Sequence, residues 1–196
     1  MGDNSSGNYR FSPVDVVVVI PVNLSAVQSR KNHGAAGAFD LPVDRLAPIH
    51  GPVTVEPRAI GSGHEIVFQF DGPIATPGAA AAVDGSGASL AVSPPVINAG
   101  SSLSVTLSGI ADNSRATISL TGVNGNVAAS SVSIGFLIGD ANNSRAVDAI
   151  DISGVKARSG QITDSTNFGF DLNASGAINS ADILTVKARA GAVLVP

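Results

Sequence analysis

The C-terminal part of the chain contains the same segment twice, and this duplication constrains the fold more than any other feature. The first copy reads DANNSRAVDAIDISGVKARSG (140–160) and the second reads DLNASGAINSADILTVKARAG (171–191), at a constant offset of 31 residues (171 − 140). Acidic and amide positions, several apolar positions, a Lys-Ala-Arg triplet and a closing Gly coincide. A repeat of this kind indicates two copies of one supersecondary unit. The sequence therefore predicts a separate module over residues 139–196.

Oxygen-bearing residues recur in both copies with the spacing of a calcium-binding loop. Calcium takes six to eight oxygen ligands, and a twelve-residue loop supplies them from positions 1, 3, 5, 7, 9 and 12, position 7 through its carbonyl. Position 8 is apolar in both loops, Val147 and Ile178, as expected if the loops pack together. Each loop leads into a short helix with Lys and Arg near its end, where positive charge complements the helix dipole. The sequence predicts calcium (two ions) as the cofactor, with these ligands: Asp140, Asn142, Ser144, Ala146, Asp148, Asp151, Asp171, Asn173, Ser175, Ala177, Asn179 and Asp182.

The two loops differ in charge although their spacing is the same. The first has Asp at positions 1, 9 and 12, whereas the second has Asp171 and Asp182 with Asn179 at position 9. Because calcium affinity rises with the number of carboxylates, the first loop is expected to bind more tightly. Chelation of calcium is expected to melt this module before the rest of the chain.

These repeats resemble the type I dockerin module, a pair of calcium loops each followed by a helix, found in extracellular bacterial proteins. The resemblance covers residues 139–191. Position 5 is Ser in both loops where the family commonly has Asp, and position 6 is Arg145 in the first loop where the family commonly has Gly. The resemblance implies an extracellular or cell-surface location and a cohesin-like protein as partner. It implies docking through these helix residues: Ala149, Ile150, Lys156, Arg158, Ser180, Ala181, Lys187 and Arg189.

Alternating apolar and polar residues predict β-strands through the middle of the chain. Leu103, Val105 and Leu107 alternate with Ser and Thr, and similar patterns continue through 116–120 and 132–136. With turn signals between these runs, roughly seven strands at this spacing indicate an immunoglobulin-like β-sandwich over residues 31–138. The fold class is therefore mostly β, a sandwich followed by a small α-helical module. The other expected strands lie at 53–56, 66–70 and 88–92.

The N-terminal residues 1–30 combine a polar tail with a strongly apolar segment, PVDVVVVIPV (13–22). A strand that is apolar on both faces must be buried on both sides. It either forms the first strand of its own sandwich or inserts into a neighbouring subunit, and it resembles the donor strand of pilus-type filament subunits. A head-to-tail contact of this kind builds a filament. The candidate assembly strand contains Val14, Val16, Val17, Val18, Val19, Ile20 and Val22.

Composition and charge exclude several classes of function. With 44% hydrophobic and 13% charged residues, the chain has the material for a folded core. The 11 Lys and Arg residues are scattered and the net charge is −4, so we expect no nucleic-acid partner. The longest apolar run, 16–22, is too short to cross a bilayer, so we expect no membrane span.

The residues that could carry catalysis form no recognisable site. His33, His50 and His64 share no spacing and are expected at the surface. The pairs Glu56–Arg58 and His64–Glu65 are typical of charges across neighbouring strands. No catalytic motif is present, so the sequence predicts a protein that is not an enzyme.

Two hypotheses of function follow from these patterns. The first is a calcium-stabilised, extracellular structural protein that assembles into a homo-oligomeric filament through its N-terminal strand. The alternative is a dockerin-type binding module that anchors the β-sandwich to a cohesin-bearing partner.

Overall fold

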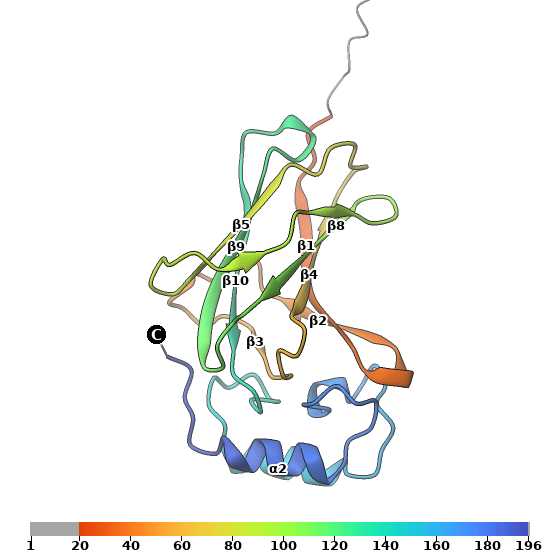
Figure 1. Cartoon of the computed structure of the whole chain (residues 1–196), viewed down its shortest axis with the longest axis vertical. Coiled ribbons are helices and arrows are strands. Elements are labelled where there is room, and N and C mark those ends of the chain that lie inside the picture. Colours follow the sequence, from red (N-terminus) through yellow and green to blue (C-terminus); the bar gives the residue numbers. More distant parts are fainter. Residues whose placement is uncertain (1–19, 196) are drawn as a thin grey trace, which may run out of the picture.

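The structure is a computed structural model that describes residues 20–195. Two β-sheets form a sandwich, and a helical module lies at one end of the long axis (Figure 1). This arrangement confirms the predicted fold class, mostly β with a small helical module after the sandwich.

The larger sheet contains six strands, in the order β2-β1-β4-β8-β6, with β7 also paired to β8. Its pairings are antiparallel, and Val27 of β1 lies opposite Val43 of β2 on one side and Phe68 of β4 on the other. β1 is therefore paired along both edges within its own chain. The strands of this sheet are β1 (Leu24–Asn32), β2 (Ala38–Val43), β4 (His64–Phe70), β6 (Ala91–Val92), β7 (Val96–Ile97) and β8 (Ser102–Ser108).

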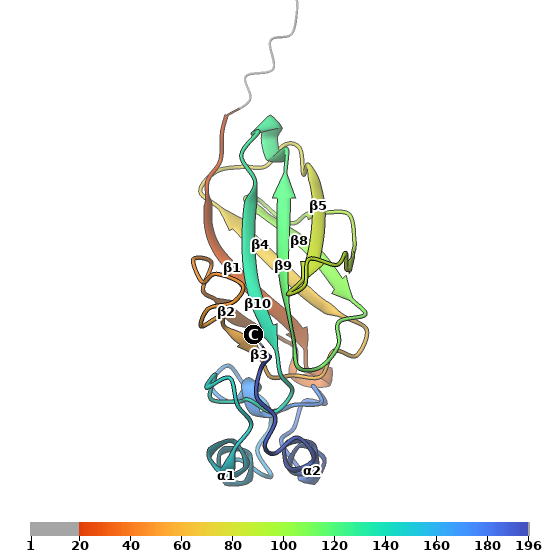
Figure 2. The same ribbon diagram turned by 90° about the vertical axis from the view of Figure 1, so that its left-hand side faces the viewer.

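The smaller sheet contains four strands, in the order β3-β10-β9-β5. β10 pairs antiparallel with β9 and parallel with β3, which places β3 at the edge beside the helical module (Figure 2). The strands of this sheet are β3 (Val55–Glu56), β5 (Ala79–Asp84), β9 (Ser114–Thr121) and β10 (Ser130–Phe136).

The sandwich core lies between the inward faces of the two sheets. Leu103 and Leu107 of β8 are fully buried, and Thr106 between them is exposed, as the alternating pattern predicts. Ile118 and Leu120 contribute the same alternation from β9 in the other sheet. Burying a side chain of this size stabilises the fold by roughly 1.5–3 kcal/mol, so these positions fix which face of each strand points inward.

The structure changes the interpretation of the N-terminal segment. Val14 and Val16 to Val19 lie outside the described residues. Ile20 is exposed and Val22 is buried in the sandwich core of its own chain, and neither is in a strand. The first described strand, β1, begins at Leu24 and crosses the boundary predicted at residue 30.

Two short helices make up the C-terminal module, with α1 at Ala149–Ala157 and α2 at Ser180–Ala188. They lie side by side at the end of the molecule farthest from residue 20 (Figure 2). No helix within residues 20–195 has the length and apolar character needed to cross a membrane. Three 3-10 turns complete the secondary structure: η1 (Gly34–Ala36), η2 (Val123–Gly125) and η3 (Phe168–Phe170).

The module shares a hydrophobic core with one end of the sandwich. Val53, just before β3, and Val55 of β3 are buried in one cluster with Leu172, Val155 and Val186 of the module. A backbone hydrogen bond of 2.7 Å from Ala59 to the Leu172 carbonyl adds to this contact. The module is thus packed against the sandwich by apolar side chains and backbone bonds together.

Candidate functional site

The two candidate calcium loops have the same backbone conformation. Position 4 has a left-handed φ in both, 60° at Asn143 and 54° at Ala174, and position 6 has one too, 70° at Arg145 and 97° at Gly176. This conformation costs a residue with a side chain roughly 1–2 kcal/mol, whereas Gly adopts it freely. The first loop therefore has a strained Arg at the turn where the second loop has a Gly.

Hydrogen bonds within the first loop gather its backbone amides around the carboxylates. Asp140 Oδ1 accepts from the Ser144 amide at 2.8 Å, and Oδ2 accepts from the Arg145 amide at 2.8 Å. Asn142 Oδ1 also accepts from the Ser144 amide, at 2.9 Å. The side-chain oxygens of positions 1, 3 and 5 are thereby held on one short turn.

Positions 9 and 12 link each loop to its helix through a capping box. Asp148 Oδ1 accepts from the Ile150 amide at 2.7 Å, and the Asp148 amide donates to Asp151 Oδ2 at 2.9 Å. Asn179 and Asp182 make the same pair of contacts in the second copy. These caps begin α1 and α2 and satisfy amides that have no partner inside the helix. Predicted calcium ligands thus also serve as helix caps.

The second loop repeats this geometry and adds contacts from outside the loop. Asp171 Oδ2 accepts from the Gly176 amide at 2.8 Å, as its counterpart does in the first loop. The same oxygen accepts from Thr163 Oγ1 at 2.7 Å and lies 2.7 Å from Nδ1 of His33. His33 follows β1 of the sandwich, so one loop is bonded to the sandwich through its position-1 carboxylate.

Four loop carboxylates are buried, and their charges are largely uncompensated. Asp140, Asp151, Asp171 and Asp182 are all at most 1% exposed. Of these four carboxylates, only that of Asp171 has a potentially cationic side chain, His33, within ion-pair distance in the described part of the chain. Burial raises the pKa of Asp140 and also that of Asp182, although backbone amides oppose the shift. A buried carboxylate without a cation is costly, and a bound divalent ion would relieve that cost.

The chemistry of the predicted ligands fits a hard cation, with few charges per site. Within residues 20–195, no three His, Asp or Glu side chains converge on one point. Asn142 and Ser144, together with carbonyl oxygens, would have to complete the six or more oxygens that calcium requires. The ligand set remains a prediction, and its oxygen-only composition favours calcium over zinc or other soft metals.

A buried polar network in the sandwich corrects two expectations from the sequence. Glu56 and Arg58 form an ion pair with N–O distances from 2.6 Å and no side-chain exposure, so they are not an exposed cross-strand pair. His33 and His64, expected at the surface, are also buried, whereas His50 is exposed. Burial opposes ionisation of Glu56, but the Arg58 charge prevails and lowers the pKa of Glu56 to about 2. This network lies directly beside the second loop.

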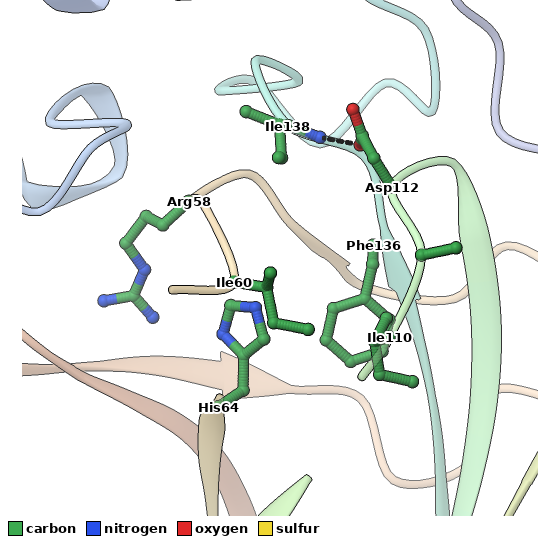
Figure 3. Close-up of a pocket in the computed structure, with 8 residues that line it drawn as sticks. Arg58, Ile60, His64, Ile110, Asp112, Phe136 and Ile138 are labelled. Carbon is green, nitrogen blue, oxygen red and sulfur yellow. Dashed lines mark hydrogen bonds between the residues drawn. The ribbon is translucent and has the colours of Figure 1, made fainter. Parts of the chain in front are cut away.

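The cavity next to this network is small (Figure 3). It measures about 50 Å³ and lies beside His64, with Ile110 and Phe136 in its walls. His64 Nδ1 is buried without a partner in the described chain and lies 3.9 Å from Glu56 Oε2. Burial is the main cause that lowers the pKa of His64 to about 4. A cavity of this size accommodates water rather than a substrate, since ligand pockets are typically about 300–1,000 Å³.

Asp112, in the turn between β8 and β9, makes a second polar link between sandwich and module. Its Oδ1 accepts from the Ile138 amide at 2.9 Å (Figure 3), and its Oδ2 accepts from Arg189 Nε at 2.7 Å. Both side chains of the ion pair are about one third exposed, so the pair adds at most about 1 kcal/mol.

The helices leave most of the implied docking residues open to solvent. Arg158 lies over the Phe170 ring at 3.8 Å, and Arg189 is bound to Asp112, so these two side chains are engaged within the chain. Apolar side chains are exposed on both helices, with Ile150 on α1 and Leu184 on α2 each 67% exposed. The implied docking residues that are exposed are Ala149, Ile150, Lys156, Ser180, Ala181 and Lys187.

Sequence reasoning did not predict that His33, Arg58 and Thr163 surround the second loop. His33 lies 138 residues before Asp171, and no spacing rule relates the two. The Glu56-x-Arg58 pair was the available signal, because two opposite charges close together in an apolar region can be a buried pair.

Comparison with known families identifies the repeat segment. Residues 138–189 match the sequence model of the family described as Dockerin type I domain. This match confirms the resemblance derived from the repeat and extends over both loops and both helices. A comparison with curated proteins finds no match to the chain.

Proposed function

From the dockerin-like identity of residues 138–189, we propose that this protein is a calcium-dependent docking protein. The helical module binds a cohesin-type domain and thereby attaches the β-sandwich to that partner, outside the cell. A dockerin module is a non-catalytic binding module, so the protein's role in this proposal is attachment.

The buried loop carboxylates carry this proposal. Asp140 and Asp151 are held close enough that the charge of Asp151 adds to the raised pKa of Asp140, after the larger effect of burial. Divalent calcium would neutralise both carboxylates and link the start of the loop to the start of α1. Calcium would therefore stabilise the folded module by mass action, and with it the helix orientation to which a partner binds.

The position of the helices supports docking at the end of the molecule. The loops lie against the sandwich, where the Val55 amide donates to Asn143 Oδ1 at 2.7 Å, while α1 and α2 lie on the side away from it (Figure 2). Ile150 and Leu184 are the large exposed apolar side chains of α1 and α2, and Lys156 and Lys187 add positive charge near the two helix ends. Apolar side chains beside charged ones are typical of a protein interface.

Binding to cohesin domains tests the proposal. The intact chain should bind at least one of a panel of immobilised cohesin domains in calcium and lose that binding in EDTA. Ile150→Asp and Leu184→Asp should each weaken binding by about 2 kcal/mol, roughly 30-fold, if the residue is central to the interface. Leu46→Asp is the matched control, since Leu46 is 77% exposed on the sandwich and should leave binding unchanged. Binding that survives both EDTA and the two helix variants would refute the proposal.

The filament hypothesis receives no support from the described residues. β1 already pairs with β2 and β4 of its own chain, and Val22 contributes to its own core. Size-exclusion chromatography in calcium separates the two hypotheses, because the docking proposal predicts a protein that gains mass only when a cohesin domain is added.

A further inference from the structure

The second calcium loop differs from the first in having a sandwich side chain on its position-1 carboxylate. His33 Nδ1 lies 2.7 Å from Asp171 Oδ2, and both side chains are completely buried. Within residues 20–195, the Asp140 carboxylate at the same position of the first loop accepts only from groups of its own loop. Only the second loop therefore has a direct side-chain bond from its position-1 carboxylate to the sandwich.

The other ring nitrogen of His33 determines which way this hydrogen bond runs. His33 Nε2 lies 3.2 Å from Arg58 Nη1. A guanidinium has only donors, so Nε2 must accept, and the proton of the neutral ring is then on Nδ1. His33 thus donates to Asp171 as a neutral imidazole. Glu56 balances the Arg58 charge through two further bonds, at 2.6 and 2.7 Å, which keep the guanidinium in place.

Donors are distributed unequally between the two oxygens of Asp171. Oδ2 is bonded to His33, Thr163 and the Gly176 amide. Among the described residues, Oδ1 accepts only from the Ser175 amide, at 3.0 Å. This arrangement fixes the carboxylate rotamer and leaves acceptor capacity on Oδ1 for a cation. Proteins commonly orient a metal ligand, and so adjust metal affinity, with a hydrogen-bond donor on the side of the ligand away from the metal.

The backbone of the turn after β1 also lies in close contact with the backbone of the second loop. A Cβ on Gly176 would lie 2.7 Å from the His33 carbonyl oxygen, and a Cβ on Gly34 would lie 2.6 Å from the Ser175 carbonyl oxygen. The turn after β1 and the second loop therefore touch through glycines on both sides. Phe39 of β2 and Phe168 stack at 5.7 Å beside His33 and close the contact from the side.

We propose that His33 is a positioning residue for the second calcium loop and that the sandwich is thereby part of that site. It holds Asp171 ready for the ion, so calcium binding at this loop and folding of the β1–β2 end of the sandwich stabilise each other. The first loop lacks such a bond at its position-1 carboxylate and contacts the sandwich at β3 instead, where Asn143 Oδ1 accepts from the Val55 amide at 2.7 Å. The inference rests on the proposed calcium loading of the loops.

Paired substitutions in single-site backgrounds test the coupling. Asp151→Ala disables the first loop and leaves the second, and Asp182→Ala does the opposite. In the Asp151→Ala background, His33→Phe keeps an aromatic ring but removes the donor, and it should weaken calcium binding 10–100-fold by calorimetric titration. His33→Asn, which retains a donor, should recover part of that loss. In the Asp182→Ala background, His33→Phe should change calcium affinity less than about twofold.

Hydrogen exchange measures the same coupling between calcium binding and the sandwich in protein that retains His33. Calcium should protect the amides of β1 and β2 when only the second loop can bind, and should leave them unchanged when only the first can. Equal weakening of both loops by His33→Phe, or equal protection from either loop, would overturn the inference. If neither Asp151→Ala nor Asp182→Ala removes a binding event, the proposed calcium function fails instead, which is a different result.

Discussion

The two candidate calcium loops share a local structure but differ in their surroundings, and the main difference is at the position-1 carboxylate. Asp140 and Asp171 occupy the same loop position and accept from equivalent backbone amides. Burial raises the pKa of Asp140, whereas at Asp171 the same burial is outweighed by the His33 and Thr163 hydrogen bonds, which lower the pKa. Duplicated sequence thus gives duplicated backbone, while tertiary contacts set the chemistry of each copy.

The comparison also changes the expected ranking of the two sites. The first loop has the additional carboxylate Asp148, but Arg145 next to position 5 offsets one negative charge, so the loops carry similar net charge. Asp148 Oδ1 is already used as a helix cap. Since affinity depends on rigidity as well as on charge, the positioned Asp171 favours the second loop. Measurements of stability, calcium affinity and carboxyl titration test this difference between the loops.

The largest effect is expected at position 6 of the second loop. Gly176→Ala should destabilise the protein by about 2–4 kcal/mol, because the new methyl group meets the His33 carbonyl and the backbone has a positive φ. Gly160→Ala is the matched control, since Gly160 has φ of 90° but nothing within 4 Å, and it should cost only about 1 kcal/mol. Urea denaturation measures both. Equal losses would mean that the sandwich does not press on the second loop.

The next effect concerns calcium affinity. Asp151→Ala should leave a single binding event at the second loop, and Asp182→Ala a single event at the first. Prepositioning of Asp171 predicts that the second loop binds about tenfold more tightly, or about 1.4 kcal/mol. Calorimetric titration of the two variants measures the ranking directly. Tighter binding by the first loop would show that carboxylate count outweighs prepositioning.

A smaller effect is expected at position 6 of the first loop. Arg145→Gly should stabilise the protein by about 1 kcal/mol, because Gly removes the cost of the left-handed conformation that Arg145 adopts at φ 70°. The midpoint of thermal unfolding in EDTA measures this gain. Arg45→Gly is a control for the loss of charge, since Arg45 is an exposed Arg in a turn of the sandwich. A gain of the same size at both positions would attribute the effect to charge.

The smallest net effect is on stability against pH, because the two position-1 carboxylates act in opposite directions. The raised pKa of Asp140 gives stability that is present below its unfolded value of 3.8 and is lost as pH rises through the folded pKa. The lowered pKa of Asp171 gives stability that is present above 3.8 and is lost as pH falls through the folded pKa.

Carbon NMR of the aspartate carboxyls in calcium-free protein resolves the two opposing contributions. The titration midpoint of Asp140 should lie above 3.8 and that of Asp171 below it. In a His33→Phe variant, only the Asp171 midpoint should rise. Coincident midpoints in the unsubstituted protein would remove the electrostatic difference between the loops.

The sequence predicts local features of the module better than it predicts contacts across the chain. The spacing of Asp140 and Asp151 predicts the loop and the helix start, because both depend on neighbouring residues. β1 has the sequence LSAVQSRKN, whose inward side includes a buried Ser, so its hydrophobic pattern is weak. β5 is a run of Ala with no alternation, and the structure alone identifies it as a strand.

Sequence patterns do not predict which polar side chains of this protein are buried. His33 is a typical surface residue by type, and it is buried because Asp171 and Arg58 satisfy both of its ring nitrogens. The sequence also predicts a module that melts separately on chelation. Because Val53 and Leu172 share one apolar core, we expect the unfolding of the module to be linked to that of the sandwich.

The placement of the helices has a mechanical consequence. The segment that leads into β1 lies at one end of the long axis and α1 and α2 lie at the other, with β1 running lengthwise between them (Figure 2). Tension between a docked partner and the N-terminal side of the sandwich would pull β1 along its own direction. Its hydrogen bonds to β2 and β4 would then be loaded together in shear rather than opened one by one, and the rate of forced unfolding would depend on the whole strand. Under such tension, the paired strands would make the molecule a stiff link along its length.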